Sequence, residues 1–343
     1  MFTEAIAAIL AHHCTTDIVR GIEAGASAQL LSGALHDAGF LELLAPEERG
    51  GADVGWPDFF EVVSLCGAWA VPLPLAQTIA ARRLTTEPQQ LPVGFISFAP
   101  ALTRGSDGTF HAHNVPSGRT SSHVIGAMDE VLVLLAVSDA SASSSGRSAS
   151  GTHADGIHGS LDASFCWPAH VAKGLRGGIP AAELAPIAAL LHAGLLAGAM
   201  KRCFDLTMSY ANERAQFGKP IGKFQAIQHQ LSVMAEHVAA GRMAAEAAFG
   251  TDARRPGAMA CAVAKARTSE AAQHVAAIAH AVHGAIGVTA EYDLQLFTRR
   301  LHAWRMAHGS EACWHRVLGQ CFLDSTQPLA VDFVRTVWEG ASA

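Results

Sequence analysis

The sequence has few charged residues and lacks the basic runs that bind nucleic acids or anionic membranes. Asp, Glu, Lys and Arg together make up 16% of the 343 residues, and the formal net charge is −6. Proteins that bind phosphate backbones or acidic lipid surfaces concentrate lysine and arginine in patches or runs. We therefore expect neither a nucleic acid nor a membrane as a partner.

Cysteine is scarce, and its spacing carries no signature. The seven cysteines are an odd number, and no two of them form a Cys-x-x-Cys pair. This scattered set favours a reducing cytoplasm in which the thiols are free and buried, rather than a disulfide framework. The opening residues Met1–Glu4 also lack the basic and apolar regions of a secretion signal, which agrees with a cytoplasmic location.

Several catalytic and metal-binding signatures are missing as well. The sequence has no Gly-x-x-x-x-Gly-Lys loop, no strand-linked Gly-x-Gly-x-x-Gly and no Gly-x-Ser-x-Gly. Their absence argues against nucleoside triphosphatases, nicotinamide dehydrogenases and α/β-hydrolases. His111 and His113 could share one face of a strand, and His12 adjoins His13, but no third ligand stands at a suitable spacing. We interpret these histidines as solvent-facing and expect no metal.

What the sequence does have is apolar residues, which make up 50% of the chain and include many alanines. This length and composition are typical of a helix-rich protein with a large core in about two or three domains. The longest apolar stretch, Leu184–Met200, is interrupted by Pro186 and His192. It is therefore predicted to be a buried helix and not a membrane span.

Changes in hydrophobic periodicity divide the chain into three predicted domains: residues 1–90, 91–178 and 179–343. In the first domain, which is helical, one helix ends at Gly39 and another spans Trp56–Trp69, with a turn at Pro46–Gly51 between them.

The second domain is a short β domain, with strands predicted at Val93–Phe98 and Glu130–Val137 and a mobile surface loop at Ser138–Gly151. The third is a helical bundle with an apolar stripe on its second helix, which is expected to pack against its neighbours. Its predicted helices are 181–212, 223–249, 257–283, 291–303 and 310–323, and the stripe is Phe224, Ile227, Leu231, Met234 and Val238.

The most informative segment runs from Tyr210 to His229 and joins two of the long helices. Arg214, next to a helix break, offers a planar fork of donors to a pyrophosphate. Phe217 can cover an adenine face, and Gln216 and Gln225 can hydrogen-bond to ribose or base edges. The turn at residues 218–222 would bring the next helix N-terminus close to a phosphate. A plain helix–turn–helix corner with an exposed arginine and a core phenylalanine fits the same spacing, and spacing alone favours it.

The run Arg214-Ala-Gln-Phe-Gly-Lys-Pro-Ile-Gly-Lys-Phe-Gln-Ala-Ile-Gln-His229 resembles the flavin-adenine clamp of acyl-CoA dehydrogenases, a motif highly specific to that family. Residues 39–51 resemble a turn of its N-terminal domain, residues 127–134 resemble a strand of its middle domain, and residues 283–292 resemble its glycine turn. The resemblance therefore covers essentially the whole chain.

This resemblance implies the acyl-CoA dehydrogenase fold, which is mainly α with a small β domain. Its parts are an N-terminal helical domain, a middle β domain and a C-terminal four-helix bundle. It also implies FAD, with this chain gripping the ADP half of a flavin that is housed mainly in a neighbouring subunit. The residues that would grip it are Arg214, Gln216, Phe217, Phe224, Gln225 and, in the glycine turn, Gly284.

The position of the family's catalytic base does not hold a carboxylate. The family removes a proton α to a thioester carbonyl with a glutamate. The matching segment Trp304–Glu311 places His308 there, and the alternative family position on an earlier helix falls at Ala188. His308 could act as a base because imidazole titrates near neutrality, but a surface or helix-capping histidine is commoner. Glu311 is three residues out of register and is expected in the first turn of the next helix.

The segments that cover the flavin ring in the family are also eroded. Gly105-Ser106-Asp107 resembles one of these segments only weakly, and the Trp-Ile-Thr of the other is missing. In the glycine turn, Ala281 and Ala285 replace the usual glutamine and second glycine. Residues that would serve a partner's flavin thus persist, whereas those that would hold and use the chain's own flavin are lost.

This asymmetry resembles the shorter, non-catalytic subunit of the α2β2 acyl-CoA dehydrogenases of bacterial steroid side-chain degradation. It implies a homologous catalytic subunit as partner, shared FAD and an acyl-CoA substrate, with no catalytic residue in this chain. Two alternatives stay open. One is a self-sufficient homotetrameric dehydrogenase that uses His308, and the other is a flavin-free structural homo-oligomer.

Overall fold

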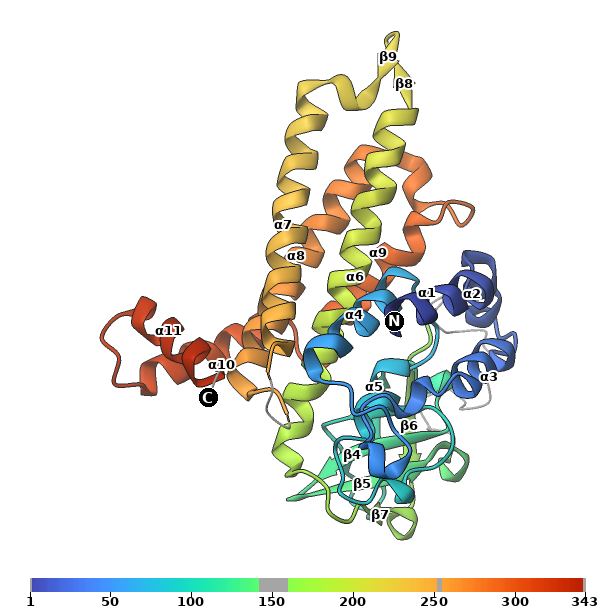
Figure 1. Ribbon diagram of the computed structural model, residues 1–343, viewed down its shortest axis with the longest axis vertical. Coiled ribbons are helices and arrows are strands. Elements are labelled where there is room, and N and C mark those ends of the chain that lie inside the picture. The colour runs from blue at the N-terminus through green and yellow to red at the C-terminus, as the bar shows by residue number, and fades with distance from the viewer. Residues whose placement is uncertain (1, 142–159, 252–254, 342–343) are drawn as a thin grey trace. The chain divides into compact units, whose positions relative to one another are not determined.

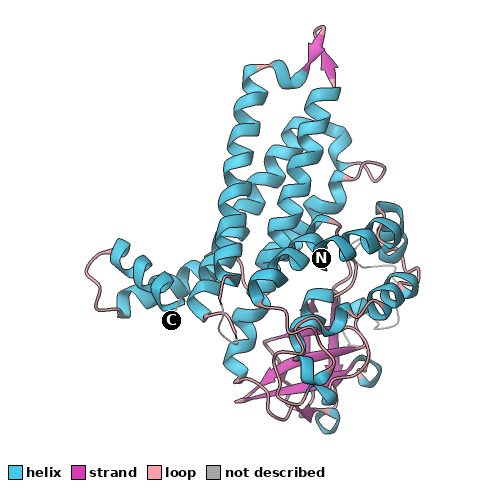
Figure 2. Ribbon diagram, in the orientation of Figure 1, coloured by secondary structure: helices cyan, strands magenta, loops and turns pink. Residues whose placement is uncertain are grey.

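The computed structural model describes residues 2–141, 160–251 and 255–341. These residues form two compact units, and each unit is built from two separate stretches of the chain. The first unit contains residues 1–55 and 71–188, and the second contains residues 56–70 and 189–343. Helices make up most of the described chain, and the strands other than one short hairpin belong to the first unit (Figure 2). The predicted fold class, mainly α with a small β part, is confirmed.

The first unit begins with helices broken by turns, as predicted for this part of the sequence. Gly39 follows α3 with a φ of +75°, a left-handed conformation that a glycine adopts without strain. Residues 142–151 of the predicted surface loop lie outside the described residues. The helices of this unit are α1 (Phe2–His13), α2 (Thr16–Glu23), α3 (Gln29–Asp37) and α5 (Leu75–Ala81).

Two small sheets follow in the same unit, with orders β1-β4-β5-β7 and β2-β3-β6. β1 pairs in parallel with β4, and the other pairs are antiparallel. Apolar side chains that include Val124, Leu135 and Trp167 form a core cluster with contributions from both sheets. The strands are β1 (Ile96–Ala99), β2 (Thr103–Arg104), β3 (Phe110–Val115), β4 (His123–Met128), β5 (Val131–Ala136), β6 (Ala163–Trp167) and β7 (Lys173–Gly174).

The second unit is a helical bundle in which α6 (from Ala189 onward), α7 and α8 lie side by side (Figure 1). The β8–β9 hairpin joins α6 to α7 at one end of this bundle. The elements are α4 (Trp56–Ala68), α6 (Leu184–Glu213), β8 (Ala215–Gln216), β9 (Lys219–Pro220), α7 (Gln225–Phe249), α8 (Ala258–His283), α9 (Leu294–Met306), α10 (Glu311–Asp324) and α11 (Ala330–Ala341).

Glycines let α4 and α6 approach each other closely. A Cβ added at Gly198 would lie 1.8 Å from the carbonyl oxygen of Ser64, and one at Gly67 would lie 2.0 Å from that of Leu195. Side chains at these positions would force the two backbones apart. The contact therefore needs glycine on both helices.

The helix at Ala181–Glu213 is long and apolar enough to cross a membrane, but 83% of its most apolar window is buried inside the protein. Buried core helices pass the same test of length and composition. The prediction of a buried helix at Leu184–Met200 is therefore confirmed.

The cysteines are free thiols, as expected, but not all of them are buried. Cys14, Cys66, Cys203 and Cys261 are buried, whereas Cys313 is exposed on α10. Burial raises the pKa of the Cys261 thiol to about 12, so this thiol is inert at neutral pH.

Candidate functional site

The β8–β9 hairpin carries the centre of the clamp motif. Gln216 pairs with Lys219, and the residues between them, Phe217 and Gly218, have φ angles of +52° and +80°. Such a turn matches the twist of the strands, but it favours asparagine and glycine at its two central positions. A phenylalanine there is strained, and its side chain is 92% exposed.

Polar and aromatic clamp side chains surround this turn. The side chains of Arg214, Gln216 and Gln225 are exposed and make no hydrogen bond to the described part of the chain. The Phe224 ring, half-buried, lies edge-to-face with that of Phe217 at a centroid distance of 6.2 Å. Lys219 Nζ lies 4.4 Å from the centre of the Phe224 ring. The Arg214 guanidinium, the exposed Phe217 ring and two side-chain amides are thus presented outward together.

The predicted glycine turn lies at the same end of the bundle. Gly284 follows α8 with a φ of +66°, and the Tyr210 hydroxyl donates to the carbonyl of His283 at 3.4 Å. The Tyr210 and His283 rings stack at 4.4 Å. An apolar cluster beneath joins clamp residues to the end of α8 that precedes the turn: Ala211, Ile221, Leu231 and Val282 are buried in it, and Phe224 and Ile227 pack against them. The structure therefore brings together the two segments that the sequence singled out separately.

This end of the bundle fits the adenine half of a flavin. An exposed guanidinium suits a pyrophosphate, an exposed ring suits a planar base, and side-chain amides suit ribose or base edges. These groups lie on the hairpin and at the start of α7, are exposed, and would cover a ligand from one side only. A complete site would need a second surface.

His308 is partly buried, with its ring nitrogen Nε2 shielded from solvent, contrary to the interpretation of this residue as a surface or capping histidine. Its ring meets that of His192 edge-on at 4.7 Å, and its carbonyl accepts a hydrogen bond of 3.0 Å from Trp314 Nε1. Its φ is +56°, in the left-handed region. Burial, and next the neighbouring His192 and Lys265, lower the pKa of His308 well below the ordinary value. At neutral pH the imidazole is uncharged.

Lys265 was not singled out from the sequence, yet its side chain is entirely buried. Nζ donates to Ser269 Oγ at 2.9 Å and to the carbonyls of Trp304 and Arg305 at 2.8 and 2.9 Å. The two carbonyls belong to the last turn of α9, where helices lack internal donors. Burial lowers the pKa of Lys265 to about 7, but only the ammonium form has the three N–H bonds that this geometry uses. A lone lysine in an alanine-rich helix was the available signal.

Glu311 is the first residue of α10, as predicted. Its carboxylate pairs with Arg305, whose Nε lies 2.8 Å from Oε2. Hydrogen bonding to Arg305 is the largest cause that lowers the pKa of Glu311, so this carboxylate stays ionised and engaged. At the other family position for a base, Ala188 is fully buried on α6 and carries no acid–base group.

The remaining sequence candidates lie in the first unit, whereas the clamp belongs to the second. Asp107 sits in the turn between β2 and β3, where a hydrogen bond of 2.6 Å from Thr109 Oγ1 is the main cause of its lowered pKa. The rings of His111 and His113 stack at 6.3 Å, and His111 Nε2 lies 2.8 Å from Thr109 Oγ1. Among the described residues, no group of three metal-ligating side chains gathers.

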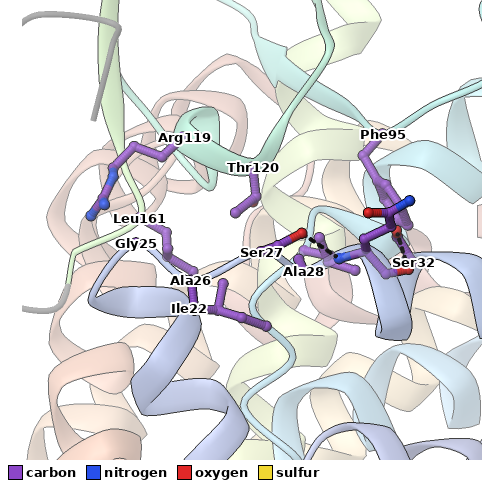
Figure 3. A pocket seen from close by; sticks show the side chains of 12 residues that line it. Ile22, Gly25, Ala26, Ser27, Ala28, Ser32, Phe95, Arg119, Thr120 and Leu161 are labelled. Carbon is purple, nitrogen blue, oxygen red and sulfur yellow. Dashed lines mark hydrogen bonds between the residues drawn. The ribbon is translucent and has the colours of Figure 1, made fainter. Parts of the chain in front are cut away.

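A cavity of about 360 Å³ also lies in this unit, between the α2–α3 loop and the β3–β4 connection (Figure 3). Arg119 and Thr120 line it from one side, and Ala26, Ser27 and Ala28 line it from the other. Arg119 donates to the Ser160 carbonyl at 2.7 Å. No residue of the clamp or of the glycine turn contributes to this cavity.

The acyl-CoA dehydrogenase C-terminal domain model matches residues 181–320. Acyl-CoA dehydrogenase IpdE2 of Mycolicibacterium smegmatis is 30% identical over 312 residues, which cover 88% of this chain and 91% of that protein. The chain belongs to the acyl-CoA dehydrogenase family. Members of this family are oxidoreductases, and a long relative at this identity extends the assignment beyond the C-terminal domain.

Solved structures confirm the acyl-CoA dehydrogenase fold over nearly the whole chain. A chain of the ChsE4-ChsE5 complex from Mycobacterium tuberculosis superposes with a TM-score of 0.79 at 19% identity, covering 95% of this chain and 97% of that one. The Tcur3481-Tcur3483 steroid ACAD G363A variant gives 0.76 at 22% identity, covering 94% and 96%. Structures of the same fold have been solved with FADH2 and with FAD, and the clamp geometry fits that cofactor.

Proposed function

We propose that this chain is the non-catalytic subunit of an FAD-dependent acyl-CoA dehydrogenase complex, in which it completes the FAD site of a homologous catalytic subunit. One contrast carries the proposal. The adenine clamp is intact and faces outward, whereas the base position holds His308, whose ring nitrogen Nε2 is buried. The chain thus offers contacts to a cofactor without offering a group that removes a proton.

The clamp supports binding in trans because none of the described residues of its unit covers the side chains of Arg214, Gln216 or Phe217. Phe217 combines a strained backbone with a 92% exposed ring, a combination that costs about 1–3 kcal/mol in strain alone. Such strain is typical of ligand-binding positions. Adenine stacked on this ring would bury it, and the partner's surface would close the other side of the site.

Each clamp residue has a distinct task toward FAD. Arg214 would neutralise the pyrophosphate, and Gln216 and Gln225 would hydrogen-bond to the ribose or the base. Phe217 would cover the adenine, supported from below by Phe224. The glycine turn at Gly284 would approach the ligand through its backbone. When bound, FAD supplies the hydride acceptor for oxidation of the acyl chain.

Removal of the α-proton would fall to the partner subunit. His308 is uncharged and its Nε2 is buried, and Ala188 carries no acid–base group. A base must come within about 2.6–3.2 Å of the proton it removes, and a buried ring at a strained turn lacks that access. The complex would introduce an α,β-double bond into an acyl-CoA.

The similarity to IpdE2, to one chain of a two-subunit complex and to a steroid dehydrogenase supports the finer parts of the proposal. These parts are an α2β2 assembly, a related catalytic subunit as partner and a bulky steroid-like acyl group. We also propose that the complex is cytoplasmic, as its sequence composition predicts.

The test is flavin content and native mass, measured on this chain alone and after co-expression with its genomic neighbours. The proposal expects a colourless chain alone and a yellow mixed tetramer with one FAD for each pair of subunits. A yellow homotetramer that acyl-CoA bleaches would favour the self-sufficient alternative with His308. A colourless chain under every condition would favour the flavin-free alternative.

Two variants sharpen this test. Arg214→Ala should weaken FAD retention in the complex by about 10–100-fold, because it removes a charge-assisted pair. Arg316→Ala, which removes an exposed arginine on α10, is the matched control and should retain the flavin. His308→Asn should keep turnover within about twofold, since asparagine tolerates the positive φ. A large loss of rate in His308→Asn with full FAD content would contradict the non-catalytic assignment.

A further inference from the structure

The short connection between α9 and α10, residues Ala307–Ser310, is strained and held from several sides. His308 and Gly309 have φ angles of +56° and +99°. We call these four residues the α9–α10 turn. Lys265 donates hydrogen bonds to the Trp304 and Arg305 carbonyls, which lie just before this turn. Trp314 Nε1 donates to the His308 carbonyl in the middle of the turn. A strained turn persists only where such contacts outweigh its cost.

Basic groups surround the buried end of this turn. His308 Nε2 has no hydrogen-bond partner within the described residues. The titratable groups that face the His308–Lys265 cluster are His192 on α6, Arg305 on α9, and Glu311 and Cys313 on α10. The one carboxylate in this described set, Glu311, is already paired with Arg305. A proton added to His308 would therefore create a buried cation beside Lys265 without an available counter-ion.

Helix α10 buries few of its own side chains where it docks on α8. Trp314 is its one buried residue among those described, and it packs with Ala189, Ala262 and Ala266. Leu318, partly buried, is packed against the same cluster. Regions with few buried apolar contacts open locally at low cost. The hydrogen bond from Trp314 to the His308 carbonyl couples the docking of α10 to the α9–α10 turn.

We propose that the α9–α10 turn is an acid-sensitive latch: when His308 takes up a proton, the imidazole leaves the interior and α10 undocks from the bundle. The proposal does not depend on flavin sharing, because each group in it belongs to this chain. It gives the base position of the family a conformational role in place of a catalytic one.

The direction of the pH dependence follows from which state of the turn, closed or open, binds the His308 proton more tightly. In the closed turn the pKa of His308 is well below its ordinary value, whereas an opened His308 titrates near about 6.5. The closed state is therefore favoured in full above about pH 6.5 and is progressively lost as the pH falls. Each pH unit below that value shifts the ratio of closed to open turn by about tenfold, until the pKa of the closed state is reached.

The test is amide hydrogen exchange, followed by mass spectrometry, on the full chain in its native assembly at pH 7.5 and pH 5.5. Rates are corrected for the intrinsic pH dependence of exchange. Peptides that cover residues 306–320 should lose protection by about tenfold at pH 5.5. Peptides from the middle of α7 should keep theirs. Uniform loss of protection along the chain, or none at residues 306–320, would overturn the proposal.

His308→Asn should abolish the pH dependence at residues 306–320. His315→Asn, the same substitution at an exposed histidine on α10, should leave it in place. Retention of the pH dependence in His308→Asn would overturn the proposal. Should that variant fail to fold, the ring resonances of His308 in the NMR spectrum of the unmodified chain decide the matter. They should show a neutral ring at pH 7.5 and a growing protonated fraction at pH 5.5, and a ring that stays neutral at both would refute the latch.

Discussion

At the scale of single residues, Phe217 and Lys265 are both costly where they stand. Phe217 occupies a turn position that suits asparagine, with its ring in solvent. Lys265 is a lysine enclosed in the bundle with two main-chain carbonyls as acceptors. The cost of exposing the Phe217 ring is relieved only by a ligand or a partner outside the unit. The cost of burying Lys265 is offset within the unit, because its ammonium donates hydrogen bonds to the free carbonyls at the end of a helix.

Phe217→Asn is predicted to separate stability from cofactor binding. Asn-Gly is the preferred pair for a two-residue hairpin turn with positive φ angles, so the free energy of unfolding of the isolated chain should rise by about 0.5–1 kcal/mol. FAD retention in the complex should fall because the adenine loses its ring. Denaturant titration and flavin release measure the two effects. A variant that loses stability, or keeps its flavin, would refute the assigned role of Phe217.

Lys265→Met is predicted to destabilise the chain by about 2–4 kcal/mol, because it leaves two carbonyls and a hydroxyl buried without their donor. Lys201→Met is the matched control. It removes an exposed pair with Asp205 on α6 and should cost less than about 0.5 kcal/mol. Urea unfolding monitored by circular dichroism gives both values. Equal effects of the two substitutions would show that the hydrogen bonds of the buried ammonium do not stabilise the fold.

At the scale of elements, periodicity predicted the long helices well and the short strands poorly. The predicted helices 223–249 and 257–283 correspond to α7 (Gln225–Phe249) and α8 (Ala258–His283). In helices of that length, apolar residues recur at the helical spacing over many turns, so the pattern is unambiguous. Strand β4 (His123–Met128) was missed, and β1 (Ile96–Ala99) starts three residues after the predicted Val93. Gly94, with a φ of +150°, interrupts that run.

The residues of the candidate site also fall into two groups, those that the sequence predicted and those that it did not. Arg214, Gln216 and Gln225 were found because a local motif carries them, although spacing alone favoured a plain corner and only the family resemblance reversed that preference. The burial of His308 and the three hydrogen bonds of Lys265 depend on residues far away in the sequence, such as His192 and Trp304. A local pattern cannot encode such contacts. Helix α11 (Ala330–Ala341) was not predicted either.

The contact between α4 and α6 gives a prediction at this scale. Gly198→Ala should destabilise the chain by more than about 3 kcal/mol, because the new Cβ would lie 1.8 Å from a carbonyl oxygen that belongs to another helix. Gly33→Ala, in α3, is the control, since an added Cβ meets nothing within 4 Å there. It should be neutral or stabilising by about 0.5–1 kcal/mol. Thermal unfolding of the two variants checks both signs, and similar melting temperatures would contradict the close-approach argument.

At the scale of the whole molecule, membership of the acyl-CoA dehydrogenase family and the fold are established, and the proposed division of labour concerns assembly. The predicted three-domain boundaries at residues 90 and 178 remain a prediction. If the complex shares its flavin, loss of FAD and loss of the mixed assembly should be coupled. We expect added FAD to raise the melting temperature of the mixed complex and to leave that of this chain alone unchanged. Differential scanning calorimetry with and without FAD distinguishes this outcome from stabilisation of both samples.

The exposed ring of Phe217 also bears on how such a chain must be made in a cell. A copy without its companion displays a rigid aromatic side chain at the tip of a hairpin, and chaperones and proteases select surfaces of this kind. The lifetime of an orphaned copy is then set by how soon it is captured. If the proposed complex forms, synthesis of the two polypeptides in matched amounts would limit this exposure, and we expect an excess of this chain to be cleared and not stored.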